Sequence, residues 1–202
     1  MNLKDYTLTD FIAKATDTSS LPGGGSICAL NGALAASLGI MVLGLSRKKI
    51  QAPEKVEKLR ALSDELRENI EADGRSFEGV LEGLKMPKET PEEAALRSRA
   101  IQEGYQRAME VPHSTVLGSL EVLKILASVA KDMDPYAYSD LRIARDLAMT
   151  AIHGALYTMD LNLPHLSNEE KKEHYRRLME EEEEMARAHA IAIEQTLQLL
   201  EG

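Results

Sequence analysis

The sequence has no tryptophan, only two phenylalanines and a single cysteine among its 202 residues. A chain with so few aromatic residues must build its core from aliphatic side chains and methionine, which suits helices better than β-sheets. The single cysteine, Cys28, excludes an intramolecular disulfide and fits a reducing compartment, so we expect a cytoplasmic protein. Cys28 lies among small apolar residues, which favours an inert buried thiol over a nucleophile.

Positive charge is also scarce, because 24 Lys and Arg stand against 33 Asp and Glu, for a net charge of −9. The sequence carries no basic stripe of the kind that binds phosphate backbones, so we expect no DNA or RNA partner. Residues 1–20 carry three aspartates and lack the basic-then-apolar order of a signal peptide. The length fits one domain, and we expect residues 1–202 to form a single unit with a sizeable core.

The motifs of common metal and nucleotide sites are missing as well. The five histidines form no i, i+4 pair of the kind that binds zinc, and the one Glu-x-x-His, from Glu110 to His113, contains Pro112. The glycines at 23–25 are not followed by Gly-Lys-Ser/Thr, and no dinucleotide fingerprint follows a strand. We therefore expect neither a metal nor a nucleotide cofactor.

A glycine-rich loop is present, and it precedes an uncharged run from Ile27 to Ser46. The loop consists of Pro22, Gly23, Gly24, Gly25 and Ser26. Glycines let a ligand or another chain approach the backbone closely, and the free N–H groups of a first helical turn attract anions. Ser26 is placed to cap the helix that follows. By local chemistry alone, the loop fits a ligand site and a tight turn into a buried helix equally well.

The uncharged run is about as long as a membrane span of roughly 20 residues. Small residues four apart, such as Gly32 with Ala36, also suit helix packing in a membrane. The run is nevertheless rich in alanine rather than leucine, and 28% of the chain's residues are charged. A helix that is apolar on every side is also what the centre of a helical protein requires. We therefore predict a central core helix that reaches about Lys49, with a single-pass membrane protein as the less favoured alternative.

Short-range patterns predict further helices along the chain. Residues 5–15 predict a short helix that is capped by Thr7 and turns Leu8, Phe11 and Ile12 inward. Since these patterns involve no strand signal, the fold class that we expect is all-α. It is a single-domain helical bundle of about six to seven helices around the small-residue-rich apolar helix.

The later helices are marked by prolines and capping boxes. Pro53 begins one helix whose apolar stripe runs to Leu84, and the capping boxes at 90–93 and 167–170 begin two others. Asp134-Pro135 precedes one more helix. In the helix that begins at the capping box 90–93, Pro112 interrupts the helical pattern. Because the apolar spacing resumes after Pro112, a kink is expected rather than a break.

Two aspartates occupy apolar stripes of the predicted helices. Asp73 lies three residues after Ile70 and four before Phe77, where a core side chain is expected. A carboxylate there requires hydrogen-bond partners or a raised pKa. Asp140 begins another stripe, at a position where it could simply cap the helix. Both acids are therefore candidate acid–base groups, and both also have a structural interpretation.

Taken in order, these motifs resemble the cyclodeaminase/cyclohydrolase family of folate enzymes, from about residue 8 to residue 165. That family includes the cyclodeaminase domain of formiminotransferase-cyclodeaminase and stand-alone methenyltetrahydrofolate cyclohydrolases. The matching features are Phe11, the loop from Pro22 to Ser26, the alanine-rich helix before Lys48-Lys49, Asp73 with Phe77, Val111-Pro112, Ser139-Asp140, and Gly154-Ala155-Leu156 leading to Asn162.

The resemblance implies an all-helical homodimer that holds folate near the glycine loop at the subunit interface, without a metal. It implies hydrolysis of 5,10-methenyltetrahydrofolate to 10-formyltetrahydrofolate, or cyclisation of 5-formiminotetrahydrofolate with release of ammonia. Tetrahydrofolate would carry the reacting carbon, with no other cofactor. We expect Asp73 to transfer the proton, with Asp140 orienting it or holding the pterin ring. The substrate-binding residues that the resemblance implies are Pro22, Gly23, Gly24, Gly25, Ser26, Ser139, Asn162 and Lys48.

Three positions depart from the residues that are usual in this family. Tyr136 and Thr158 stand where Asn is usual, and Arg142 stands where Gly is usual. Arg142 beside Asp140 would fill space and lower the pKa of a nearby carboxylate. These departures motivate an alternative to the enzyme, a divergent non-catalytic homodimer that binds a folate-like ligand or a protein partner. Because the chain is acidic, local cations such as those at 47–49 must attract an anionic folate.

Overall fold

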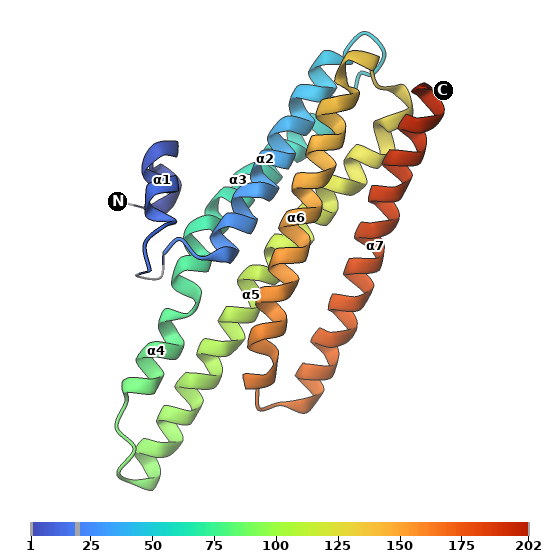
Figure 1. Ribbon diagram of the computed structural model, residues 1–202. Coiled ribbons are helices and arrows are strands. Elements are labelled where there is room, and N and C mark those ends of the chain that lie inside the picture. Colours follow the sequence, from blue (N-terminus) through green and yellow to red (C-terminus); the bar gives the residue numbers. More distant parts are fainter. Residues whose placement is uncertain (1, 19–20, 202) are drawn as a thin grey trace.

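The computed structural model describes residues 2–18 and 21–201, and every regular element within those ranges is helical. The α-helices are α1 (Leu8–Lys14), α2 (Gly24–Leu45), α3 (Pro53–Ser76), α4 (Glu78–Lys85), α5 (Pro91–Val129), α6 (Tyr138–Asn162) and α7 (Glu169–Glu201). Short 3-10 helices lie at Leu3–Asp5, Ala130–Asp132, Pro135–Ala137 and Leu163–His165. The elements form one elongated bundle (Figure 1), which confirms the predicted all-α class.

Helix α2 is the central helix of the bundle, packed against α3, α5 and α6 (Figure 1). Its small residues allow the close approach, since a Cβ added at Gly32 would lie 2.6 Å from the Ser119 hydroxyl of α5. The helix starts at Gly24, earlier than predicted, so Gly23 is its N-cap residue. Ser26 therefore lies inside the first turn and is fully buried, and its predicted role as the cap is wrong.

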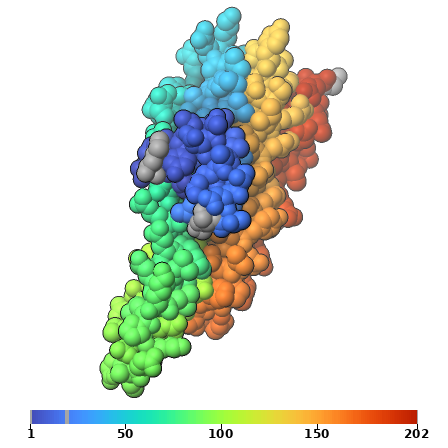
Figure 2. Space-filling model, turned by 60° about the vertical axis from the view of Figure 1, so that its left-hand side comes forward, coloured from blue at the N-terminus to red at the C-terminus, as the bar shows by residue number. Residues whose placement is uncertain are grey.

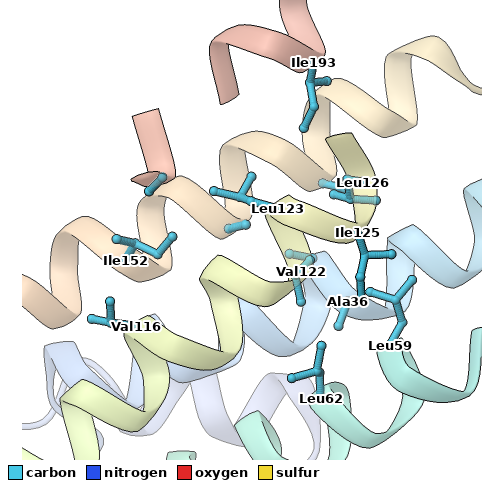
Figure 3. Packing of buried hydrophobic residues seen from close by; sticks show 14 of the residues in the cluster. Ala36, Leu59, Leu62, Val116, Val122, Leu123, Ile125, Leu126, Ile152 and Ile193 are labelled. Atoms are coloured by element: carbon cyan, nitrogen blue, oxygen red, sulfur yellow. The ribbon is translucent and has the colours of Figure 1, made fainter. Parts of the chain in front are cut away.

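The main core lies between α2, α3, α5, α6 and α7 (Figure 3). Leu59, Leu123, Ile152 and Ile193, from four different helices, are each fully buried in it. Burial of one such side chain contributes about 1.5–3 kcal/mol to folding. Two helical segments, Gly24–Leu45 and Pro91–Asp132, are long and apolar enough to span a membrane, and 50% and 56% of their apolar windows are buried inside the bundle.

The capping predictions for α1 and α5 are confirmed. The Thr7 hydroxyl accepts a hydrogen bond from the Asp10 N–H at 3.1 Å. Thr90 and Glu93 form the reciprocal capping box of α5, which continues unbroken across Pro112. The predicted inward position of Phe11 is also correct, because that ring is buried.

Two other helix predictions are wrong. Leu8 and Ile12 are 71% and 58% exposed, because α1 has only seven residues and packs on the bundle through Phe11. The helix predicted from Pro53 to Leu84 is divided at Phe77 into α3 and α4. Glycines at 74 and 79 flank the division, and glycine is a poor helix former.

Ion pairs hold α7 against α6. The Arg142 guanidinium donates to both carboxylate oxygens of Glu201 at 2.8 Å and, through Nε, to Glu194 at 3.2 Å. Arg145 also donates to Glu194. These arginines lower the pKa of Glu194, and Arg142 lowers the pKa of Glu201. Arg142 was expected to act on a carboxylate near Asp140, but its partners are two glutamates of the C-terminal helix.

Replacing this arginine is expected to loosen the packing of α7 on α6. Arg142→Gly should lower the melting temperature modestly, because the pairs are solvent-exposed, and 1 M salt should shrink the difference. Since Arg142 lowers the pKa of both glutamates, its stabilisation is present above their unfolded pKa and is lost as the pH falls through the folded values. Thermal denaturation at pH 7 and pH 3, with and without salt, measures this. A difference that is unchanged by both salt and pH would contradict the ion-pair explanation.

Candidate functional site

A cleft of about 830 Å³ opens beside the N-terminal turn of α2. Its walls come from the glycine loop, the end of α3, the start of α4 and the C-terminal half of α6. The volume lies within the range of about 300–1,000 Å³ that is typical of small-molecule sites. A smaller cavity of about 370 Å³ lies between α6 and α7, and it contains none of the predicted site residues.

Asp73 lies at the base of the cleft, against the first turn of α2. The Ser26 hydroxyl lies 3.4 Å from Asp73 Oδ2 and donates to the carbonyl of Ile70 at 2.8 Å. Burial raises the pKa of Asp73, and hydrogen bonds from the hydroxyl and the N–H of Ser26 oppose part of that effect. A carboxyl group with a raised pKa, open to a cleft, is suited to accept a proton and return it.

The glycine loop admits this carboxyl group. A Cβ added at Gly25 would lie 2.1 Å from Asp73 Oδ1, whereas one added at Gly24 would meet nothing within 4 Å. The loop was expected to let a ligand or another chain come close to the backbone. Within the chain, the group that approaches Gly25 is the Asp73 side chain, and the absence of a Cβ is what allows it.

The wall of the cleft next to the glycine loop forms where α2 packs closely on α6. A Cβ added at Gly154 would lie 2.2 Å from the Cys28 sulfur, so the glycine lets the two helices meet. Cys28 is buried, and burial together with the negative charge of Asp73 raises the pKa of its thiol to about 11. The thiol therefore stays protonated at neutral pH, as expected of an inert buried cysteine.

Asn162 closes the same cleft from the last turn of α6. Its amide donates to the carbonyls of Ala108 at 3.2 Å and Thr158 at 3.0 Å, which fixes the side chain in place. Gly23, Gly24 and Gly25 line the cleft with it, while Pro22 and Ser26 are buried and do not belong to its wall.

Asp140, Ser139 and Lys48 lie at the opposite end of the bundle. Asp140 is in the first turn of α6, about 21 Å from Gly154 along the helix axis at about 1.5 Å per residue. Lys48 follows the C-terminus of α2, and this end of α2 meets the start of α6 through a hydrogen bond from the Asp134 N–H to Ser46 Oγ at 3.0 Å. Asp73 and Asp140 therefore do not converge on one cleft within a single chain, and that expectation is wrong.

Two aromatic residues of the cleft wall, Phe77 and Tyr157, were not predicted to belong to the site. Tyr157 is 73% exposed, an unusual position for a large ring. Tyr157 lies three residues after Gly154 and four before Leu161, so these residues share one face of α6, and Asn162 adjoins that face. This helical spacing is the feature of the sequence from which Tyr157 could have been predicted to line the site. Of the three departures from the family, only Thr158 lines the cleft, while Tyr136 is 91% exposed near the start of α6.

The cleft is poor in positive charge. Among the described residues that line it, none is a lysine, an arginine or a histidine, although Asp73 and Glu78 are acidic. Nor do the described residues contain a group of three or more His, Cys, Asp or Glu side chains that could hold a metal ion.

Comparison with known proteins gives a consistent result. The family model described as formiminotransferase-cyclodeaminase matches residues 7–192, which extends the similarity beyond residue 165 into α7. Mouse formimidoyltransferase-cyclodeaminase is 31% identical over 85% of this chain, and the chain covers 33% of that protein. Methenyltetrahydrofolate cyclohydrolase from Methylorubrum extorquens is 28% identical, over 77% of this chain and 78% of its own length.

The fold also has a close counterpart among solved structures. The crystal structure of formiminotetrahydrofolate cyclodeaminase from Thermotoga maritima superposes with a TM-score of 0.86 at 22% identity. The similarity covers 99% of this chain and all of the other one. By contrast, the present chain spans only about a third of the vertebrate relatives that it matches.

Proposed function

The chain belongs to the formiminotransferase-cyclodeaminase family, and from this membership we propose that it is a folate one-carbon enzyme. It hydrolyses 5,10-methenyltetrahydrofolate to 10-formyltetrahydrofolate, or it cyclises 5-formiminotetrahydrofolate with release of ammonia. Tetrahydrofolate is the substrate carrier in either case. The observation that carries the proposal is the Asp73 carboxyl group, with its raised pKa, at the base of a cleft of suitable volume.

In the hydrolytic reaction, Asp73 acts first as a base. Its carboxylate takes a proton from a water molecule as the water oxygen bonds to the carbon that bridges N5 and N10. The protonated Asp73 then returns that proton to N5 as the bond between N5 and the carbon breaks. The hydroxyl oxygen forms the C=O bond and releases its own proton to solvent, which leaves the formyl group on N10. The cationic methenyl substrate and water thus give neutral 10-formyltetrahydrofolate and one proton.

The cyclodeaminase reaction uses the same group in the same order. N10 attacks the formimino carbon while Asp73 accepts the N10 proton. Asp73 then donates that proton to the departing nitrogen, and a second proton taken from solvent completes ammonia as the methenyl bridge forms and takes the positive charge. A carboxyl group with an unperturbed pKa of about 3.9 would be a poor acid for this second step, so the raised pKa of Asp73 favours it.

The apolar and aromatic part of the cleft wall suits the ring system of a folate. Phe77, Leu81 and Tyr157 offer apolar and aromatic surface to a flat ring system. The alternative of a non-catalytic folate-binding dimer was motivated by Tyr136, Arg142 and Thr158. Since only Thr158 lines the cleft, the catalytic proposal is the stronger of the two.

We also propose that the enzyme is a cytoplasmic homodimer without a nucleic-acid or membrane partner. The lone cysteine and the acidic composition support the location and the absence of nucleic acid. A second copy would cover the apolar side chains that α2 exposes. Expression as a dimer that stays in solution without detergent supports this assembly, and a requirement for detergent contradicts it.

The direct test follows both substrates with purified protein. The loss of near-ultraviolet absorbance from 5,10-methenyltetrahydrofolate reports hydrolysis, and ammonia release from 5-formiminotetrahydrofolate reports deamination. We expect one of these rates to exceed the uncatalysed rate by at least about 10⁶-fold. Acceleration of neither reaction, together with folate binding in a calorimeter, would favour the non-catalytic dimer.

A further inference from the structure

Pro112 lies inside helix α5, although a proline has no N–H to donate to the helix. In a regular α-helix, the N–H of residue 112 would donate to the carbonyl of Ala108, four residues earlier. The proline ring also crowds that carbonyl. The Ala108 carbonyl therefore lacks its usual helical donor. Because Ala108 is buried, another part of the protein has to supply a donor in place of water.

The donor that replaces the missing N–H is the side-chain amide of Asn162, in the last turn of α6. Helix α6 packs against α5 (Figure 1). The Asn162 Nδ2 lies 3.2 Å from the carbonyl oxygen of Ala108 and 3.0 Å from that of Thr158. The bond to Ala108 is buried and joins the two helices, so the carbonyl that Pro112 leaves without a donor becomes an anchor for Asn162.

These two carbonyls determine the orientation of the Asn162 amide. The amide nitrogen has two N–H donors, and each has a carbonyl to bind, whereas the amide oxygen can only accept. A flipped amide would place its oxygen against two carbonyl oxygens, which repel it. Among the described residues, none donates a hydrogen bond to Asn162 Oδ1, and Asn162 lines the cleft. This oxygen is therefore the acceptor that a bound ligand can use.

The cleft opens on the face of the bundle that Figure 2 presents. The blue surface of α1 and α2 lies there between the green surface of α3 and α4 and the orange surface of α6. Asn162 borders the cleft from α6, but Pro112 is buried in α5 and is not part of the cleft wall. An effect of Pro112 on a ligand must therefore be transmitted by a residue that it influences.

We propose that Pro112 is a positioning residue for the cleft. Because it has no N–H, it leaves the Ala108 carbonyl free to bind the Asn162 amide, and the amide oxygen then faces the ligand. The ligand group that this oxygen recognises is an N–H donor. The inference deepens the proposed function and rests on it for the identity of the donor, which is an N–H of the pterin ring. An acceptor that is already oriented costs less to order when the ligand binds.

Pro112→Ala restores the missing N–H, which then competes with Asn162 for the Ala108 carbonyl. Alanine is a far better helix former than proline, so the melting temperature should rise. The affinity for 5-formyltetrahydrofolate, measured by calorimetry, should nevertheless weaken about two- to tenfold, the usual effect of one neutral hydrogen bond. If Pro112 only shaped α5, stability and affinity would change together. Unchanged affinity in Pro112→Ala overturns the proposal.

An Asn162→Ala background shows whether the proline acts through the asparagine. Without the amide, Pro112→Ala should leave the remaining affinity unchanged, and the difference between the two backgrounds measures the coupling. A loss of equal size in both backgrounds overturns the proposal. Pro91→Ala is the matched control on the same helix. It removes a proline from the first turn, where no N–H is needed, and the affinity should stay at the wild-type value.

The side-chain amide signals of Asn162 in a nitrogen-15 NMR spectrum test the same arrangement without a ligand. Their loss in Asn162→Ala assigns them. In the wild-type protein, these protons should exchange with solvent at least about tenfold more slowly than those of the exposed Asn168. Pro112→Ala should speed up their exchange. Equal exchange rates for Asn162 and Asn168 in the wild-type protein overturn the proposal, and this comparison needs no variant of Pro112.

These readouts distinguish the inference from the proposed function. If the wild-type protein turns over neither substrate and binds no folate, the proposed function fails, while amide exchange still shows whether Pro112 positions Asn162. If the wild-type protein is active but Pro112→Ala changes neither the affinity nor the exchange of the Asn162 amide, the proposed function stands and the role of Pro112 is overturned.

Discussion

Asp73→Asn is expected to lower kcat by about 10²–10⁴-fold, the usual contribution of a positioned acid–base group. The amide keeps the shape of the carboxyl group, and its oxygen can still accept the hydrogen bonds that Ser26 donates. It cannot take a proton from water or from N10, so both proposed reactions lose their base. Steady-state kinetics measure the loss, and far-ultraviolet circular dichroism should show unchanged helical content.

The matched control is on the same helix. Asp64→Asn makes the identical substitution at an exposed position of α3, where the carboxylate pairs with Arg67 at 3.3 Å. We expect this variant to keep wild-type kinetics. If Asp73→Asn retains more than about a tenth of wild-type kcat, Asp73 is not the general base.

Asp73→Asn, which should lower kcat, is expected to raise the stability of the protein at neutral pH. Burial raises the pKa of Asp73 above its unfolded value, so the folded protein holds this proton more tightly than the unfolded chain does. The free energy of unfolding that is linked to Asp73 is therefore highest below the unfolded pKa, and it falls as the pH rises through the folded pKa. At pH 7 Asp73→Asn should melt at a higher temperature than wild type, and the two curves should meet at low pH. A variant that is less stable at pH 7 would contradict the raised pKa.

Asp73 could be predicted because it violates a pattern. A charged residue within an apolar stripe is visible in the sequence, and burying a carboxylate is unfavourable unless it has partners. The small residues of α2 were recognisable for the same reason, since a helix that is apolar on all sides must be surrounded. In both cases the signal is local, within one helix, and the predicted environment followed from it.

The positions of Asp140 and Lys48 depend on how separate helices run. Their sequence patterns place them near helix ends, but α2 and α6 are antiparallel, which puts both residues at the end remote from Gly25. The residue pattern of each helix does not show which end of it lies beside which end of another helix.

Arg142 illustrates a further limit. Its partners, Glu194 and Glu201, lie more than 50 residues later in the chain, and no short-range pattern joins them. The departure from glycine at this position was therefore interpreted as a change near the site. Because its side chain is bound to α7, the substitution bears on how the C-terminal helix is held and provides no argument against activity.

Gly25→Ala is expected to reduce kcat by about 10²-fold although the residue carries no reactive group, because displacement of a catalytic group by about 1 Å has that effect. The added methyl group would lie 2.1 Å from Asp73 Oδ1, so the carboxyl group must move away from the first turn of α2. Alanine is otherwise the better helix former, by about 0.5–1 kcal/mol. The clash opposes this gain, and kinetics together with thermal denaturation measure both effects.

Two comparisons isolate the cause of that loss. Gly44→Ala places the same methyl group on α2 where nothing lies within 4 Å, so it should keep full activity and gain slightly in melting temperature. In an Asp73→Ala background the obstructing carboxyl group is gone, and Gly25→Ala should then stabilise the protein as Gly44→Ala does. The difference between the two backgrounds is the coupling free energy of Gly25 with Asp73. A coupling of zero would show that the close approach of the Asp73 carboxyl group does not require a glycine at this position.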